Sequence, residues 1–209
     1  MHLEKLRLLG KLILSSCIFF TACNSRSSET SLPVYGERDI LGADTIFHQI
    51  PYFSFENQDG KMITSDDYQD TVYIADFFFT TCPGICPIMT KQLVRVQKEI
   101  LNHNLPVKLL SHTVDPETDS AAVLLNYAKE MKADLNIWNF VTGDKQRLYK
   151  LAESYLVVAN EDPETEIQFV HSDKLVLVDK QNRIRGMYSG IDSLEVNQLI
   201  EDLKRLVKN

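Results

Sequence analysis

The chain has 209 residues, a net charge of −7 at neutral pH and 44% hydrophobic residues. This length suits a single globular domain behind a short leader. An acidic chain without a basic stripe argues against a nucleic-acid-binding protein, and an acidic surface alone indicates no particular partner.

The N-terminus has the layout of an export signal. Three basic residues within positions 5–11 precede an uncharged stretch that is shorter than the roughly 20 residues needed to span a bilayer. The stretch ends in Phe20-Thr21-Ala22-Cys23, which is similar to a bacterial lipobox except for Phe20. We expect residues 1–22 to be a lipoprotein signal peptide, Cys23 to carry the lipid, and residues 23–31 to be a polar tether. An ordinary signal peptide with an incidental cysteine is the alternative.

Residues 32–209 read as one domain in which strands and helices alternate. The continuous apolar run at 72–79 is typical of a buried strand. Apolar residues spaced three and four apart after position 87 indicate a helix with one face on a core. Strand, helix and strand in this order predict a right-handed parallel crossover. In chain order we expect a hairpin over 51–67, a strand at 72–79, a helix from 87 to about 103, a strand at 107–114, a helix at 121–131, a strand at 137–142, a helix at 144–155, a polar loop at 160–166, a hairpin over 174–188 and a last helix from 192.

This order matches an α/β, thioredoxin-like fold with an N-terminal β-hairpin and with helices inserted after the first crossover. The last helix is predicted to turn Leu194, Leu199, Leu203 and Leu206 toward the core.

The four cysteines divide by position. Cys17 falls in the signal and Cys23 at its end, which leaves Cys82 and Cys86 in the domain. Exported proteins usually place cysteines in scattered structural disulfides, so a single local pair indicates chemistry instead. The pair follows a buried strand and opens a helix, where N–H groups and the helix dipole favour a thiolate.

The spacing of the pair leaves two chemistries open. Thioredoxin-type redox motifs have two residues between the cysteines, whereas three separate Cys82 from Cys86. On a helix, residues four apart share a face, so both thiolates can converge on one soft ion. Gly84 also permits a loop that closes a disulfide.

A third ligand is expected among the histidines. His171 precedes the strand at 174, in the loop that faces the cysteine helix of a thioredoxin fold. Thioredoxins have a cis-proline in that neighbourhood, and this chain has no proline after Pro163. His112, near the carboxyl end of its strand, is a weaker candidate. Asp173 could orient His171, although a simple surface charge is the favoured interpretation of Asp173.

The ligand set favours copper. Two thiolates and one imidazole suit Cu(I) and, with an added oxygen ligand, Cu(II). Structural zinc requires four protein ligands, and the sequence offers only three convincing ones.

Three segments resemble the Sco (SenC) family. They are Asp76-Phe77-Phe78-Phe79-Thr80-Thr81-Cys82-Pro83-Gly84-Ile85-Cys86-Pro87, Thr113-Val114-Asp115-Pro116-Glu117-Thr118-Asp119 and His171-Ser172, within a similarity that spans about Phe53 to Leu206.

The resemblance implies an exported, membrane-anchored protein that faces the periplasm or cell exterior. It implies one copper ion bound by Cys82, Cys86 and His171. Family members assist assembly of the binuclear copper site of cytochrome c oxidase, as metallochaperone, thiol reductant or both. A copper-receiving partner such as cytochrome c oxidase subunit II follows, and we expect a monomer. The family often has Asp directly before the histidine, where this chain has Val170.

Two metal-free readings remain. Cys82 and Cys86 could serve a thiol–disulfide oxidoreductase or thiol peroxidase, although the three-residue spacer and the missing cis-proline argue against this. The chain could also be an interaction lipoprotein in which the pair forms a structural disulfide.

Overall fold

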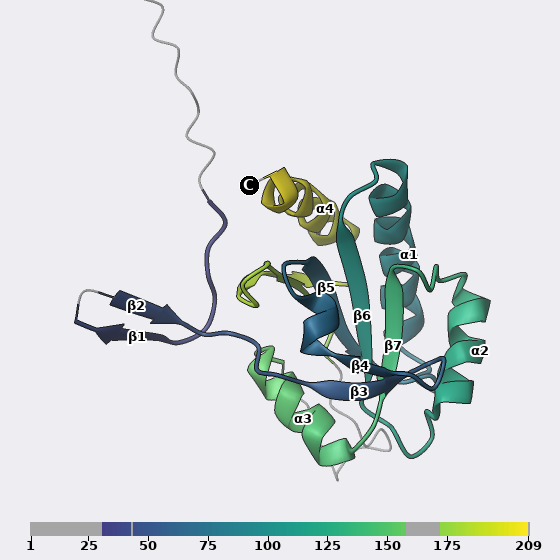
Figure 1. Ribbon diagram of the computed structural model, residues 1–209. Coiled ribbons are helices and arrows are strands. Elements are labelled where there is room, and N and C mark those ends of the chain that lie inside the picture. The colour runs from purple at the N-terminus through teal and green to yellow at the C-terminus, as the bar shows by residue number, and fades with distance from the viewer. Residues whose placement is uncertain (1–30, 43, 158–171, 209) are drawn as a thin grey trace, which may run out of the picture. The chain divides into compact units, whose positions relative to one another are not determined.

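The computed structural model describes residues 31–42, 44–157 and 172–208 (Figure 1). The chain divides into units 1–31 and 32–209, and every described helix and strand belongs to the second. No described helix is long and apolar enough to cross a membrane. The elements are β1 (Arg38–Leu41), β2 (Asp44–Phe47), β3 (Ser54–Asn57), β4 (Met62–Thr64), the 3-10 helix η1 (Ser65–Tyr68), β5 (Val72–Phe78), α1 (Cys86–Asn102), β6 (Val107–Thr113), α2 (Ala121–Met131), β7 (Trp138–Thr142), α3 (Lys145–Ser154), β8 (Lys174–Val178), β9 (Ile184–Ser189) and α4 (Ser193–Lys208).

Seven strands form one mixed sheet in the order β4-β3-β7-β6-β5-β8-β9. β5 pairs in parallel with β6, and β6 with β7, whereas the other pairs are antiparallel. All seven residues of β5 are buried, as its apolar sequence predicts for a central strand. The predicted β5-α1-β6 crossover is therefore confirmed.

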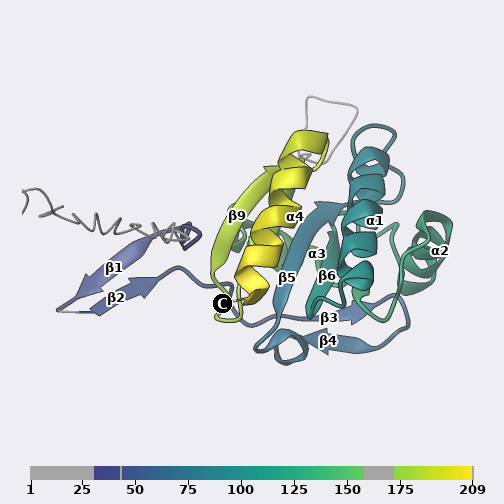
Figure 2. The same ribbon diagram turned by 90° about the horizontal axis from the view of Figure 1, so that it is seen from above.

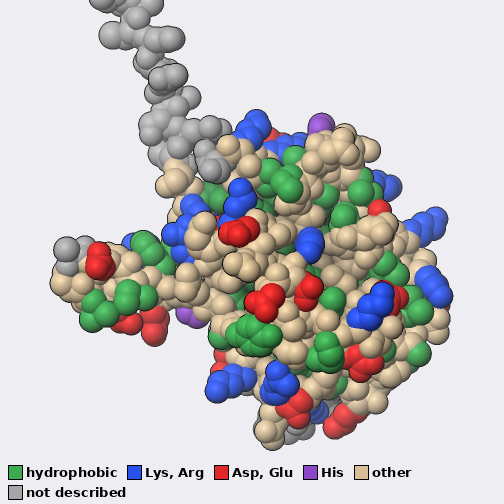
Figure 3. Space-filling view, viewed as in Figure 1, with side chains coloured by type: hydrophobic (Ala, Val, Ile, Leu, Met, Phe, Trp, Pro, Cys, Tyr) green, Lys and Arg blue, Asp and Glu red, His purple; other side chains and the backbone are tan. Residues whose placement is uncertain are grey.

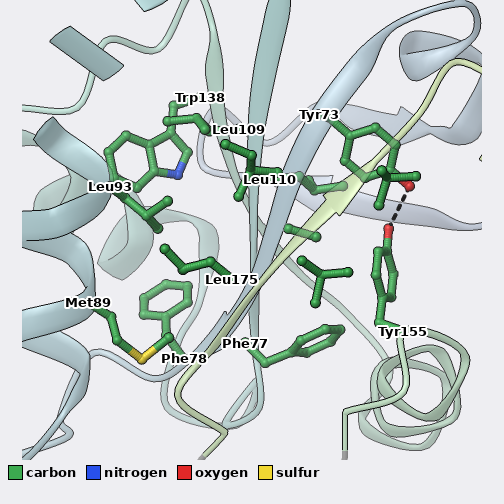
Figure 4. Packing of buried hydrophobic residues seen from close by; sticks show 14 of the residues in the cluster. Tyr73, Phe77, Phe78, Met89, Leu93, Leu109, Leu110, Trp138, Tyr155 and Leu175 are labelled. Atoms are coloured by element: carbon green, nitrogen blue, oxygen red, sulfur yellow. Dashed lines mark hydrogen bonds between the residues drawn. The ribbon is translucent and has the colours of Figure 1, made fainter. Parts of the chain in front are cut away.

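Neighbouring residues of β5 point to opposite faces of the sheet. The Phe78 ring lies 5.2 Å from that of Tyr127 on α2, whereas the Phe77 ring lies 5.5 Å from that of Tyr155, just after α3. Helices α1, α2 and α4 accordingly cover one face and α3 the other (Figure 2). Figure 4 shows Met89 of α1 beside Phe78, with Tyr155 on the far side of the strands.

Two features differ from the expectation. β1 and β2 form a separate two-stranded sheet that the sequence did not indicate, with hydrophobic side chains on its surface (Figure 3). The predicted inner face of α4 is wrong at Leu194, which is 73% exposed. The helix starts at Ser193 and buries the stripe Val196, Leu199, Ile200 and Leu203, whose spacing is that of one helical face. The predicted loop at 160–166 lies outside the described residues.

The N-terminal part of the domain is held at one end of the sheet by Arg185. This buried guanidinium donates to the carbonyl oxygens of Leu32 and Pro33 and to the carboxylate of Asp179. Tyr73 of β5 pairs with Val178, so Asp179 lies at the amino end of β5. The chain thus enters the domain at the end of the sheet opposite to the carboxyl end of β5.

Candidate metal-binding site

The junction between β5 and α1 positions the two cysteines. β5 ends at Phe78, a short turn follows, and α1 begins at Cys86 with Pro87 in its first turn. Proline suits this place because its missing N–H has no partner within a helix. Both cysteine side chains are buried, and neither forms a disulfide with another described residue.

The two thiols lie within hydrogen-bond reach of each other. Burial raises the pKa of Cys86 above the usual range of a thiol, and the neighbouring Cys82 raises it further, although the Phe79 backbone acts in the opposite sense. Burial therefore opposes the thiolate that the helix N-terminus was expected to favour at metal-free Cys86. A soft cation between the sulfurs would reverse this balance, since a coordinating thiol is deprotonated.

A hydrogen-bonded pair supports the first turn of α1. The Thr90 hydroxyl lies 2.9 Å from the Cys86 carbonyl oxygen, to which it donates, and 2.7 Å from the Tyr127 hydroxyl. Burial raises the pKa of Tyr127 above its ordinary value, so this hydroxyl stays protonated. The main chain at Cys86 is thereby fixed to both α1 and α2.

A second polar chain runs beneath the thiols, on the same face of the sheet. The Ser111 hydroxyl donates to the carboxyl of Asp76 and accepts from the Trp138 indole N–H at 2.8 Å. Burial raises the pKa of Asp76 to about 7, although the Ser111 bond opposes this.

The turn before Cys82 is tied to the loop after β6. Asp119, which is fully buried, accepts hydrogen bonds from the Thr80 backbone N–H at 3.1 Å, from the Thr80 hydroxyl and from the Thr113 hydroxyl at 2.6 Å. In the sequence, Asp119 stood out only as the end of the segment Thr113–Asp119 that resembles the Sco family. Nothing in its local pattern shows that it bonds residues 39 positions away.

His171, the predicted third ligand, lies outside the described residues. Its described neighbour Asp173 accepts a hydrogen bond from the Gly190 N–H at 2.6 Å, and Gly190 packs closely against Met89 of α1, since a methyl group there would lie 3.0 Å from Cγ of Met89. The Asp173 carboxylate contacts the Ser189 hydroxyl and, at 3.2 Å, the Lys174 ammonium. No group of three or more His, Cys, Asp or Glu side chains that could hold a metal occurs in the part of the chain described.

His112 belongs to the core on the α3 face of the sheet. Its ring stacks 4.7 Å from that of Phe77, its Nδ1 lies 3.3 Å from the Asp76 carbonyl oxygen, and its Nε2 has no partner among the described residues. Burial lowers the pKa of His112 to about 4, against the weaker effect of the Asp76 carbonyl. The structure therefore separates His112 from the thiols, which the strand position alone could not do.

Comparison with known proteins gives consistent matches. The family profile SCO1/SenC matches residues 45–208. A SCO1/SenC family lipoprotein from Bacillus anthracis strain Ames is 30% identical with a TM-score of 0.71, covering 76% of this chain and 94% of that one. BsSco, described as a member of the Sco family of cytochrome c oxidase assembly proteins with a disulfide switch, is 30% identical with a TM-score of 0.68, covering 77% and 94%.

A more distant structure shares the fold. The copper-bound ScoI of Arabidopsis thaliana is 23% identical with a TM-score of 0.63, covering 74% of this chain and 98% of that one. These structures confirm the predicted thioredoxin-like α/β fold. Because the profile extends over nearly all of the described domain, the chain belongs to the SCO1/SenC family.

Proposed function

We propose that this protein binds one copper ion through Cys82, Cys86 and His171 and delivers it during assembly of the copper site of cytochrome c oxidase. The observation that carries the proposal is the pair of buried thiols, within hydrogen-bond reach of each other, at the start of α1. Two sulfurs and one imidazole nitrogen form a soft ligand set that suits Cu(I).

The described residues next to position 171 support its part in the ligand set. β8 runs antiparallel to β5, with Val176 opposite Ala75, so residues before β8 head toward the carboxyl end of β5. That end leads into Cys82. Gly190 donates its N–H to the Asp173 carbonyl oxygen at 2.6 Å and lies beside Met89, three residues after Cys86. This placement of Asp173, two residues after the proposed ligand, supports the ligand set.

We include a reductant role and a membrane anchor in the proposal. In the reductant role, the Cys82 and Cys86 thiols lose two electrons and two protons to form a disulfide, and a target disulfide gains them to become a dithiol. The copper-receiving partner is cytochrome c oxidase subunit II. A lipid on Cys23 would hold the protein at a membrane, facing the periplasm or cell exterior.

The competing function is a metal-free thiol–disulfide oxidoreductase or thiol peroxidase. The proximity of the two thiols favours this competing function as much as it favours copper binding. The raised pKa of Cys86 disfavours a resting nucleophilic thiolate at this residue, in this function and in the reductant role alike, because the thiolate is the form that attacks.

The test is an anaerobic titration of the reduced protein with Cu(I) in competition with a chromophoric chelator. We expect one copper per chain, and a loss of affinity in Cys82→Ser, Cys86→Ser and His171→Ala that exceeds the roughly 10- to 100-fold cost of changes outside the ligand shell. His103→Ala is the control, since this histidine is exposed at the end of α1. Unchanged copper affinity in all three ligand variants would refute the site, and dithiol reductase activity without copper binding would establish the competing function.

A further inference from the structure

The buried carboxylate of Asp119 lies beside the turn that leads to Cys82, and Asp119 is not one of the proposed copper ligands. Its three donors, the Thr80 N–H, the Thr80 hydroxyl and the Thr113 hydroxyl, are all neutral. Burying a carboxylate is costly unless hydrogen bonds replace its hydration. The geometry that Asp119 imposes on Thr80 is a good explanation for a carboxylate that is costly to bury.

The contacts of Asp119 fix one end of a short turn. Thr80 is two residues before Cys82, and the Cys82 N–H donates to the Phe79 carbonyl oxygen at 3.3 Å. The turn over residues 79–82 is thus joined to β5 at its start and to Asp119 in its middle. We call residues 79–82 the Cys82 turn.

Asp119 is itself held firmly to β6. Its N–H donates to the Asp115 carbonyl oxygen at 2.8 Å, and the Asp115 N–H donates to the Thr113 hydroxyl at 3.0 Å. The main chain of Cys86 is held differently, through the Thr90 hydroxyl within α1, although its thiol also contacts the Phe79 backbone. The main chains at the two cysteines are therefore held by separate sets of hydrogen bonds.

We propose that Asp119 is a positioning residue that fixes the Cys82 turn and so keeps the Cys82 thiol beside that of Cys86. This inference deepens the proposed copper site and rests on it only for the effect on copper. Without Asp119, the Thr80 N–H and hydroxyl lose their partner, and the Cys82 turn opens locally while α1 keeps Cys86 in place.

The first test needs no copper. Reduced protein is treated with iodoacetamide, and labelling of each cysteine is followed over time by tandem mass spectrometry. In Asp119→Ala we expect Cys82 to react at least about tenfold faster than in the unaltered protein, as loss of hydrogen bonds to a charged group implies. Cys86 should react at nearly its original rate.

Asp119→Asn distinguishes geometry from charge. The amide oxygen can accept from the Thr80 N–H and the Thr113 hydroxyl, and the amide nitrogen can donate to the Thr80 hydroxyl. We therefore expect Asp119→Asn to keep Cys82 labelling within about threefold of the original rate, since the bonds are retained at reduced strength.

Asp202→Ala is the matched control. Asp202 is a buried carboxylate of α4 that accepts from the Tyr188 hydroxyl at 2.9 Å, and it makes no contact with the Cys82 turn. This variant should leave the ratio of Cys82 to Cys86 labelling unchanged. Equal acceleration of both thiols in Asp119→Ala, or no acceleration of Cys82, would overturn the proposal. If Asp119→Ala does not fold, Thr80→Val removes only the hydroxyl contact and must still raise Cys82 labelling selectively.

A second measurement follows the copper site. The sulfur-to-Cu(II) charge-transfer absorption reports the geometry at Cys82 and Cys86, and we expect its shape to change in Asp119→Ala and to return in Asp119→Asn. An unchanged absorption in Asp119→Ala would contradict the positioning role. If the protein binds no copper at all, the labelling result still decides the role of Asp119.

Discussion

Replacement of His112 by Phe should make the protein less sensitive to acid and more stable at low pH. His112 is fully buried among aromatic rings. The distances from the centre of its ring to those of its neighbours are 4.7 Å for Phe77, 5.5 Å for Tyr155, 6.2 Å for Phe53 and 6.3 Å for Phe55. Phenylalanine suits these spacings, which are ordinary for aromatic pairs. It also removes the Nε2 atom that has no described partner.

The size of the effect follows from the pKa of His112. Burial lowers this pKa to about 4, from 6.5 in the unfolded chain. Between these two pH values the unfolded chain binds more protons than the folded protein, so stability falls as the pH falls. The difference corresponds to about 3 kcal/mol, which is fully present above pH 6.5 and lost by pH 4. Above pH 7, the gain from removing the unsatisfied Nε2 and the loss of the Nδ1 contact with the Asp76 carbonyl oxygen should nearly cancel, so the variant and the unaltered protein should have similar stability there.

Urea unfolding at a series of pH values measures this directly. The single tryptophan, Trp138, is fully buried and reports unfolding by fluorescence. The quantity to compare is the difference in free energy of unfolding between His112→Phe and the unaltered protein at each pH. Asp76 lies on the opposite face of the sheet and contributes equally to the pH dependence of both proteins. His103→Gln, at an exposed position, is the control and should leave the pH profile unchanged. Parallel profiles for His112→Phe and the unaltered protein would refute the reasoning.

Three further predictions concern the polar groups around the sheet. Asp76→Asn should remove a loss of about 4 kcal/mol between pH 4 and 7, because burial raises the pKa of folded Asp76 to about 7, so over this range the carboxyl ionises only in the unfolded chain and stability declines as the pH rises; urea midpoints at both pH values measure it. Tyr127→Phe removes the hydroxyl that pairs with Thr90 and should cost about 1 kcal/mol in urea unfolding. Arg185→Ala leaves a buried carboxylate with one fewer cation and should cost about 3 kcal/mol, with faster hydrogen exchange at the Tyr35 amide.

Each of these has an outcome that contradicts it. If the stability of Asp76→Asn falls between pH 4 and 7 as steeply as that of the unaltered protein, another group causes the fall. A Tyr127→Phe protein of undiminished stability would show that the Thr90 hydroxyl needs only its carbonyl partner. Slow exchange retained at Tyr35 in Arg185→Ala would show that β9 alone holds the N-terminal segment.

Local pattern was sufficient for most of the architecture. The apolar run at 72–79 and the helical spacing after position 87 each reflect burial of a regular face, so β5 and α1 lie within a residue or two of their predicted bounds. β1 and β2 were not predicted, because nearly all of their residues are exposed and so do not alternate between buried and exposed positions as a half-buried strand does. The face of α4 was misplaced because Leu194 has the same chemistry as the buried leucines and differs from them only in tertiary surroundings.

The candidate site was predictable in part. The spacing of Cys82 and Cys86 and their place before a helix follow from the sequence, and the structure confirms both. The contribution of Asp119 could not follow, because a hydrogen bond between the turn after β5 and the loop after β6 exists only once the sheet is assembled. Asp76 did leave a signal, since a charged residue within an apolar run must find a polar partner, here Ser111.

The attachment of Leu32 and Pro33 to Arg185 has a mechanical consequence. A force applied to the segment before Leu32 reaches the domain through Arg185 of β9, at the end of the sheet remote from the thiols. Such a force is not transmitted through the Cys82 turn. For the same reason, attachment of the protein to a surface or fusion partner through the segment before Leu32 lies at the end of the sheet opposite to Cys82 and Cys86.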